Sequence, residues 1–215
     1  MKVTIIVDNT AHLPGLKKQW GFSCLVETGD AGPILFDTGM TSGVLLHNME
    51  KLGIDPAKIE RVFISHSHLD HTGGARGFGK RNPDTVMYVP GSCFSLLKPR
   101  AGEIVRVEGA VEIRPNVFST GVLKGKEQSL AVRTERGIAV IAGCSHPGVG
   151  EILRAASEFG KPVALIGGLH GFREFDLLRD LELICATHCT RHSGKIRELY
   201  PDSFVQGGAG REITI

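Results

Sequence analysis

The 215-residue chain lacks a long apolar segment. Its longest apolar runs are 138–144 and 162–169, well short of the ~20 residues that a membrane-spanning helix needs. The first residues, MKVTIIVDNT, begin like a signal peptide, but Asp8 interrupts them after a few apolar residues. We therefore interpret this segment as a first strand and expect a cytoplasmic protein with no membrane partner.

The chain also lacks a marked excess of positive or negative charge, and it has few aromatic side chains. The chain has 25 Lys and Arg against 23 Asp and Glu, and aromatics make up 6% of it. Proteins that bind nucleic acids usually carry a basic excess or stripe, and stacking on bases needs aromatic side chains. We therefore expect no nucleic-acid partner.

Cysteine is present in a small odd number, five, without a paired framework. In a chain of this length, that pattern indicates a reducing compartment, and metal ligation is the other use of such thiols. Glycine, in contrast, is abundant: its 28 residues predict many tight turns or close backbone approaches. The sequence shows no repeat, low-complexity tract or linker, so we expect one domain over residues 1–215.

The apolar pattern predicts more strands than helices. Strands are expected at 3–7, 22–27, 33–36, 61–65, 85–89, several within 104–119, 130–134, 137–142, 162–166 and 212–215. A turn at Asp30-Ala31-Gly32 joins the second strand to the third. Helical spacing occurs at 42–52, 149–159 and 175–185, and the end of the last segment also fits a strand. This order favours two β-sheets with helices outside them over a single parallel sheet.

A cluster of histidines follows the strand expected at 61–65. Residues 65–74 read Ser-His-Ser-His-Leu-Asp-His-Thr-Gly-Gly. His66 and His68 are two residues apart, so an extended chain directs both to one side. With Asp70 and His71, they offer three imidazoles and a carboxylate, a set that suits Zn, Fe, Mn or Ni. The alternative is a polar loop whose histidines are unrelated.

The pattern His-x-His-x-Asp-His after a short strand resembles the signature of the metallo-β-lactamase superfamily. Phe36-Asp37-Thr38-Gly39 and Thr72-Gly73-Gly74 resemble its flanking motifs, and the resemblance covers roughly residues 22–190. It implies an α/β (α+β layered) fold, an αββα sandwich of two mixed β-sheets with outer helices and metals at one edge. The segments 143–148, 167–170 and 187–190 are similar to those of the archaeal dihydropterin–aminobenzene ribofuranosyl phosphate synthases of methanopterin assembly.

The resemblance implies six metal ligands, which are His66, His68, Asp70, His71, His146 and His188. The family usually has a bridging aspartate after a glycine at a strand end, where this chain has Gly143-Cys144. Cys144 either replaces that aspartate as a thiolate ligand or is a buried thiol. The resemblance assigns His66 and His68 to a first metal site, and Asp70, His71 and His188 to a second. His146 can supply the missing histidine of the first site, because no histidine lies between His71 and His146.

Three further residues receive expected roles. Asp37 should lie behind the histidines and fix the orientation of a ring. Asp70 can orient a water molecule as well as ligate the second metal. His170 follows two glycines at a strand end, and it is either a ligand, a general acid, a substrate contact or a polar residue of the loop.

A competing interpretation places a structural zinc ion on four residues of one short segment, Cys185, His188, Cys189 and His192. Structural zinc sites usually separate two ligand pairs by a loop, so that a tetrahedron can close. Four ligands within eight residues would need a strongly bent backbone. On a helix, the two cysteines and the two histidines would instead occupy neighbouring i,i+4 positions.

We expect a divalent metal as the cofactor, one or two Zn, with Fe, Mn and Mg as alternatives. A bound divalent ion lowers the pKa of water from 15.7 to about 7. The sequence therefore predicts a hydrolase of a small ester or phosphoester. The alternatives are a transferase joining a dihydropterin pyrophosphate to an aromatic amine, or a non-catalytic metal- or ligand-binding module. Five basic residues favour an anionic small-molecule substrate, unless they are solvated surface charges: Lys124, Lys126, Arg173, Arg191 and Lys195.

Overall fold

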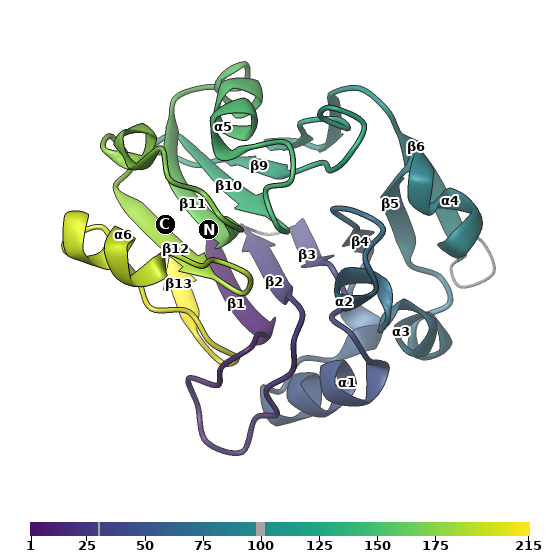
Figure 1. Ribbon diagram of the computed structural model, residues 1–215. Coiled ribbons are helices and arrows are strands. Elements are labelled where there is room, and N and C mark those ends of the chain that lie inside the picture. Colours follow the sequence, from purple (N-terminus) through teal and green to yellow (C-terminus); the bar gives the residue numbers. More distant parts are fainter. Residues whose placement is uncertain (30, 98–101) are drawn as a thin grey trace. The chain divides into compact units, whose positions relative to one another are not determined.

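The computed structural model describes residues 1–29, 31–97 and 102–215, and its chain divides into two compact units. The first unit comprises Met1–Val107 with Gly208–Thr214, and the second comprises Glu108–Gly207 with Ile215. Each unit contains one mixed β-sheet and its own helices (Figure 1). The predicted class, two mixed sheets with helices, is confirmed. That residues 1–215 act as one domain stays a prediction.

The first unit contains a seven-stranded sheet of order β13-β1-β2-β3-β4-β5-β6. Its strands are β1 (Lys2–Val7), β2 (Ser23–Thr28), β3 (Ala31–Phe36), β4 (Arg61–Phe63), β5 (Val86–Pro90), β6 (Glu103–Val107) and β13 (Glu212–Thr214). Pairing is antiparallel from β13 to β3 and parallel from β3 to β6. Strands β2 and β3 thus form the predicted hairpin, although Asp30 of its turn lies outside the described residues.

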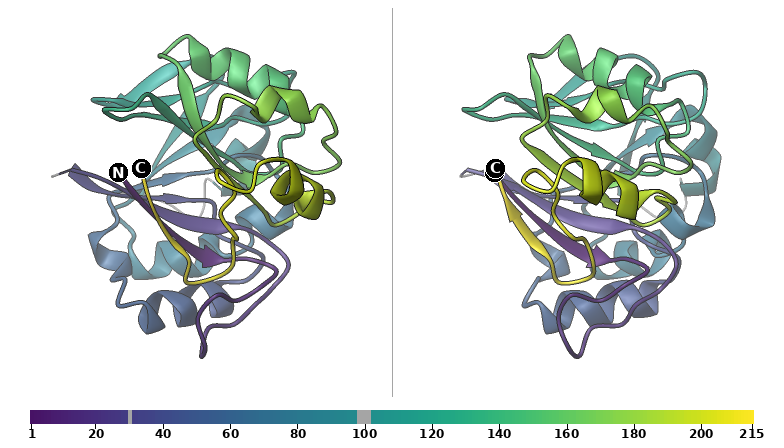
Figure 2. Two further views of the ribbon diagram at one scale, coloured as in Figure 1. Left: turned by 90° about the vertical axis from the view of Figure 1, so that its left-hand side faces the viewer. Right: turned by 60° about the vertical axis from the view of Figure 1, so that its left-hand side comes forward.

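The helices of the first unit are α1 (Ser42–Lys51), η1 (Pro56–Lys58, a 3₁₀ helix), α2 (Leu69–Thr72), α3 (Ala75–Arg81) and α4 (Gly91–Leu97). Helices α1 and α3 cover one face of the sheet (Figure 2). The buried residues Leu45 and Met49 lie one turn apart on α1, and they share a core with Phe78 of α3. This spacing is the reason that the sequence predicts α1.

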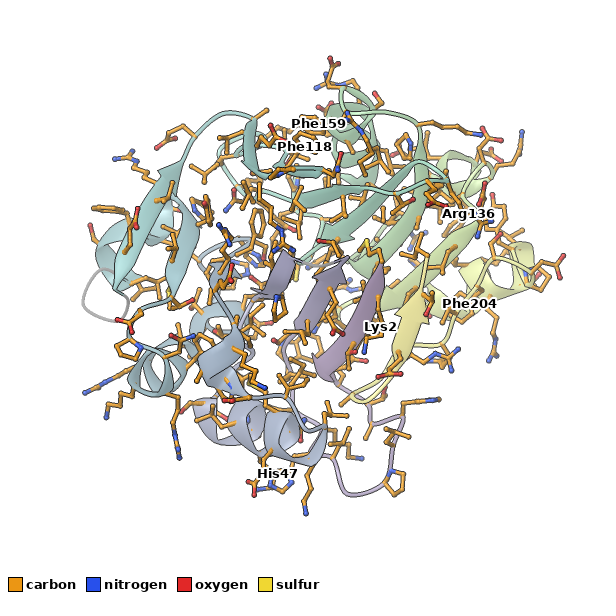
Figure 3. The ribbon with its side chains drawn as sticks, turned by 180° about the vertical axis from the view of Figure 1, so that it is seen from behind. Lys2, His47, Phe118, Arg136, Phe159 and Phe204 are labelled. Atoms are coloured by element: carbon orange, nitrogen blue, oxygen red, sulfur yellow. The ribbon has the colours of Figure 1, made fainter. Side chains whose placement is uncertain are left out.

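The second unit contains a six-stranded sheet of order β12-β11-β10-β9-β8-β7. Its elements are β7 (Val111–Arg114), β8 (Val117–Ser119), β9 (Leu130–Arg133), β10 (Ile138–Ala142), α5 (Val149–Ser157), β11 (Pro162–Gly168), η3 (Phe175–Leu178), β12 (Leu183–Thr187) and α6 (Ser193–Leu199). Strands β10, β11 and β12 are parallel, and the others pair antiparallel. The rings of Phe118 and Phe159 stack with centroids 4.5 Å apart (Figure 3).

Residues 175–185 do not form one helix, and the alternative of a strand at the end of this segment is confirmed. Phe175–Leu178 forms a single 3₁₀ turn, and Leu183–Thr187 is strand β12, which pairs in parallel with Ala164–Gly168 of β11. Residues 184–187 are buried, and a strand covered on both faces needs an unbroken apolar run that periodicity does not distinguish from a helix. Cys185 therefore lies in a strand, and the helical i,i+4 arrangement of the competing zinc site does not form.

Among the residues that the structure describes, no helix is both long and apolar enough to cross a membrane.

Candidate functional site

Four residues, three of them candidate site residues, adopt the left-handed backbone conformation shortly after the end of a strand. Asp37 follows β3, Ser145 follows β10, His170 follows β11 and His188 follows β12, with φ values of 52°, 60°, 48° and 51°. For a residue other than glycine, this conformation costs of order 1–3 kcal/mol, and such residues cluster at active sites and ligand clamps. The strand ends of both units are therefore candidate functional loops.

In the first unit, the histidine motif forms the loop from β4 into α2. His66 and His71 are buried, Asp70 is half-buried and His68 is exposed. The His66 ring centroid lies 4.6 Å from that of His68 and 4.2 Å from that of His71. The Asp70 Oδ2 atom is 3.7 Å from His71 Nε2. The structure thus brings all four residues of the motif together.

Asp37 organises this loop with a carboxylate that is fully buried. Its Oδ1 accepts from the Ser65 backbone N–H at 2.7 Å, and its Oδ2 accepts from the Ser65 hydroxyl and from His71 Nδ1, both at 2.7 Å. Because the Ser65 hydroxyl donates to Asp37, its oxygen is left to accept from His66 Nδ1, at 2.9 Å. These contacts place a hydrogen on Nδ1 of both rings, so Nε2 is the nitrogen through which each ring would bind a metal.

Gly73 and Gly74 allow the helices after the motif to approach the segment that follows β3. A Cβ atom at Gly73 would overlap the Met40 carbonyl oxygen, and one at Gly74 would overlap the Thr38 carbonyl oxygen. The hydroxyl of Thr38 also donates to the His71 carbonyl at 2.9 Å. The Thr-Gly-Gly sequence is thus explained by close packing around the motif, since any larger residue would separate the two segments.

In the second unit, the loop after β10 carries Cys144 and His146. Cys144 is buried and His146 is half-buried. The His146 ring centroid lies 5.4 Å from that of His170, which is exposed at the end of β11. The backbone of this loop is bound by Glu127, a fully buried residue that accepts from four of its N–H groups.

The loop after β12 lies beside the loop after β10 within the same unit. His188 is half-buried directly after the strand, and the Cys189 thiol donates to the Cys144 carbonyl at 4.0 Å. The ring of His192 instead packs edge-on against Phe175, at 6.2 Å between centroids. The second unit therefore has cysteine and histidine side chains at the ends of its parallel strands, whereas the His192 ring packs against Phe175.

Two of the predicted basic residues are engaged in pairs. Lys124 donates to the Pro147 carbonyl at 3.2 Å and lies 3.6 Å from Glu151, and Lys195 pairs with Glu198 at 2.8 Å. Arg173 and Arg191 are exposed. Lys124 is the one of these residues that the structure ties to the segment after Cys144 and His146.

Sequence reasoning missed two residues of these loops, Ser65 and Glu127. Ser65 directly precedes the motif, but its role depends on the contact with Asp37, 28 residues away. Glu127 contacts a loop 16–19 residues away, and no motif marks it. Its one local signal is its place in the polar run Glu127-Gln128-Ser129, which is buried although it precedes a strand.

Comparison with known families places the motif in a wider context. The family model for the metallo-beta-lactamase superfamily matches residues 21–155, which is more than half of the chain. This span includes the histidine motif, Asp37 and the loop after β10. The matched segment therefore extends over parts of both units.

Three individual proteins illustrate the likeness. The 7,8-dihydropterin-6-methyl-4-(beta-D-ribofuranosyl)-aminobenzene-5'-phosphate synthase of Methanocaldococcus jannaschii is 24% identical, over 98% of this chain and 95% of its own length. The crystal structure of Tm1679, a metal-dependent hydrolase of the beta-lactamase superfamily, superposes with a TM-score of 0.81 and 25% identity, covering 100% and 99% of the two chains. A quorum-quenching N-acyl homoserine lactone lactonase has a TM-score of 0.52 and 18% identity, over 78% and 91%. The resemblance predicted from the motifs is confirmed, for the superfamily and for the synthase subgroup.

Proposed function

The chain belongs to the metallo-beta-lactamase superfamily, and from that premise we propose that it is a metal-dependent hydrolase of a small ester or phosphoester. The arrangement around Asp37 carries the proposal. Two neighbouring imidazoles are held by their Nδ1 atoms, and a carboxylate oxygen lies 3.7 Å from one Nε2. This donor set fits a divalent metal, because imidazole nitrogen and carboxylate oxygen are common ligands of Zn and Fe.

The proposed ligands are His66, His68, Asp70, His71, His146 and His188, for one or two divalent ions. When bound, such an ion lowers the pKa of a water molecule to about 7, which supplies a nucleophile at neutral pH. Asp70 would also orient that water, and Asp37 would hold His71 and, through Ser65, His66 in position. His170, exposed beside His146, would donate a proton to the leaving group or contact the substrate.

The second proposed role of the chain is synthesis rather than hydrolysis. The likeness to the Methanocaldococcus jannaschii synthase over nearly the whole length of both chains favours it. In this role, the protein would join a dihydropterin pyrophosphate to an aromatic amine and release pyrophosphate. Pyrophosphate release that needs both substrates would identify the transferase, whereas metal-dependent cleavage of a simple phosphodiester or thioester would identify the hydrolase.

A third, non-catalytic role rests on the position where the family has its bridging aspartate. Here Gly143 is followed by Cys144, which is buried. A thiolate at this position is a good ligand for Zn, but it differs in charge distribution and reach from a carboxylate. A metal-loaded protein without turnover on any ester, phosphoester or pterin substrate would support a metal- or ligand-binding module.

Elemental analysis of the purified protein tests the metal site. We expect one or two divalent ions per chain in the wild type and a loss of one ion, or of all metal, in His188→Ala. Cys144→Ser tests whether Cys144 is a metal ligand or a buried thiol, because the metal content should fall only if Cys144 is a ligand. His192→Ala is the matched control, because its ring packs on Phe175. A metal content unchanged by His188→Ala would remove this residue from the ligand set.

A further inference from the structure

Glu127 is a buried carboxylate that binds four consecutive backbone N–H groups. Its Oε1 accepts from Gly143, Cys144 and Ser145 at 2.9, 3.0 and 3.2 Å, and its Oε2 accepts from His146 at 3.0 Å. The side chain has no solvent exposure. The Glu127 backbone is itself anchored, because its carbonyl accepts from Leu123 N–H at 2.9 Å.

The loop has a shape that suits an anion. Ser145 adopts a left-handed conformation, with φ of 60°, and the N–H groups of residues 143–146 all donate to the two oxygens of one carboxylate. Successive N–H groups in such a turn form a concave anion-binding nest. An ionised carboxylate fills this nest because it is the one type of protein side chain that offers two oxygens and no donor.

The loop that Glu127 shapes carries candidate metal ligands. Cys144 and His146 are two of the four residues whose N–H groups it binds. From the other side, the Ser145 hydroxyl donates to the Gly168 carbonyl at 2.7 Å, at the end of β11. The backbone of Cys144 and His146 is thus fixed between a buried charge and a strand end, so little freedom remains in where their side chains point.

We propose that Glu127 is a positioning residue that orients Cys144 and His146 for metal binding by fixing the backbone of residues 143–146. This inference rests on the proposed metal-dependent function and extends it to a residue that would not touch the ion. Outer groups that orient metal ligands typically change metal affinity 10–100-fold when they are replaced. A residue with a merely structural role would instead lower stability without changing metal affinity.

The variant Glu127→Gln tests this role, because it changes the acceptor of one N–H group and keeps the acceptor of the other three. The amide keeps one oxygen for Gly143, Cys144 and Ser145, but it places an NH₂ group against the His146 N–H, where two donors repel each other. Glu127→Asp keeps an acceptor-only carboxylate with a shorter reach. Glu182→Gln is the matched control in the same unit, since Glu182 is exposed and pairs with exposed Arg136.

Titration of the metal-free full-length proteins with Co²⁺, followed by visible and near-ultraviolet absorption, measures affinity and ligand geometry together. We expect Glu127→Gln to weaken Co²⁺ binding 10–100-fold and to alter the d–d bands. Glu127→Asp should lose less Co²⁺ affinity, and Glu182→Gln should match the wild type. Thermal unfolding of each metal-free protein checks that the variants are folded, and Glu127→Asp provides the comparison if the amide variant is not.

Two results would overturn the inference. If the folded Glu127 variants bind Co²⁺ with wild-type affinity and wild-type spectra, Glu127 does not position ligands, and the proposed metal-dependent function stands. If the wild-type protein itself binds no Co²⁺, no Zn²⁺ and no Fe²⁺, the proposed function fails and the inference fails with it.

Discussion

At the scale of the residue, the buried Asp37 carboxylate accepts three hydrogen bonds, all from Ser65 and His71. Asp37→Asn replaces one acceptor oxygen by a donor, while Ser65 and His71 both need an acceptor there. We expect metal affinity to fall 10–100-fold and the free energy of unfolding to fall by about 1–3 kcal/mol. Elemental analysis and urea denaturation measure the two effects.

The control for this prediction is Asp55→Asn in the same unit. Asp55 caps the 3₁₀ helix η1 through an exposed hydrogen bond to the Ala57 N–H, so an amide oxygen can replace its carboxylate at little cost. Equal metal contents in Asp37→Asn and Asp55→Asn would show that Asp37 does not control the orientation of the histidines.

The buried thiol of Cys93 should make the free energy of unfolding depend on pH. Burial raises the pKa of its thiol to about 11, opposed by the Ser92 hydroxyl and assisted by the charge of Asp37. In the unfolded chain the thiol titrates near ~8.5. The unfolded state therefore loses its proton first, and stability decreases as pH rises from about 8.5 to 11, by about 2–3 kcal/mol.

Comparison with Cys93→Ala isolates this effect, because the other groups that titrate at high pH are common to both proteins. We expect the unfolding free energy of the wild type, measured in urea at several pH values, to decrease more steeply above pH ~8.5 than that of the variant. Parallel curves for the two proteins would mean that the folded protein does not suppress ionisation of this thiol.

The ligand motif could be predicted from the sequence because its residues are contiguous. His66, His68, Asp70 and His71 occur within six positions, and the structure places them together. The groups that orient them act over longer separations: Asp37 is 34 residues from His71. Resemblance to a family located Asp37, whereas the corresponding contacts of Glu127 depend on tertiary folding alone and no local pattern shows them.

At the scale of the element, periodicity predicted the long amphipathic helices and most strands. Helix α1 has buried residues one turn apart and ends before Gly53, whose φ is 69°. Helix α3 was not predicted, because glycines at positions 77 and 79 disfavour a helix by about 1 kcal/mol each, and packing of Phe78 outweighs them. The start of strand β12 was left open between helix and strand, because its buried run has no alternation.

Helix α5 provides a test of element-level packing. Ile152 is fully buried in the core of the second unit, whereas Arg154 is exposed and pairs with Glu151. We expect Ile152→Ala to lower the free energy of unfolding by about 2–5 kcal/mol and Arg154→Ala by less than about 1 kcal/mol. Urea denaturation followed by circular dichroism measures both. Similar losses in the two variants would contradict the assignment of the buried face.

At the scale of the whole molecule, each of the two units has a hydrophobic core among its described residues. One is centred on Leu45, Met49 and Phe78, and the other contains Val140, Ile152 and Ile184. Each unit has strand ends that carry candidate ligands, since His66 follows β4 and His188 follows β12. Candidate ligands such as His66, His68 and His71 lie together only in the folded chain, so a metal that binds them would favour the folded state over the unfolded one.

Metal binding should therefore raise the unfolding temperature of the full chain. A ligand that binds only the folded state adds about 2.7 kcal/mol at 100 times its Kd, which corresponds to roughly 5–10 °C for a protein of this size. We expect this gain when Zn²⁺ is added to chelator-treated wild type, and its loss in His68→Ala, whose ring is exposed beside His66. His12→Ala, which alters an exposed histidine outside the motif, should keep the gain. An equal shift in all three proteins, measured by calorimetry, would mean that Zn²⁺ stabilises the fold from another site.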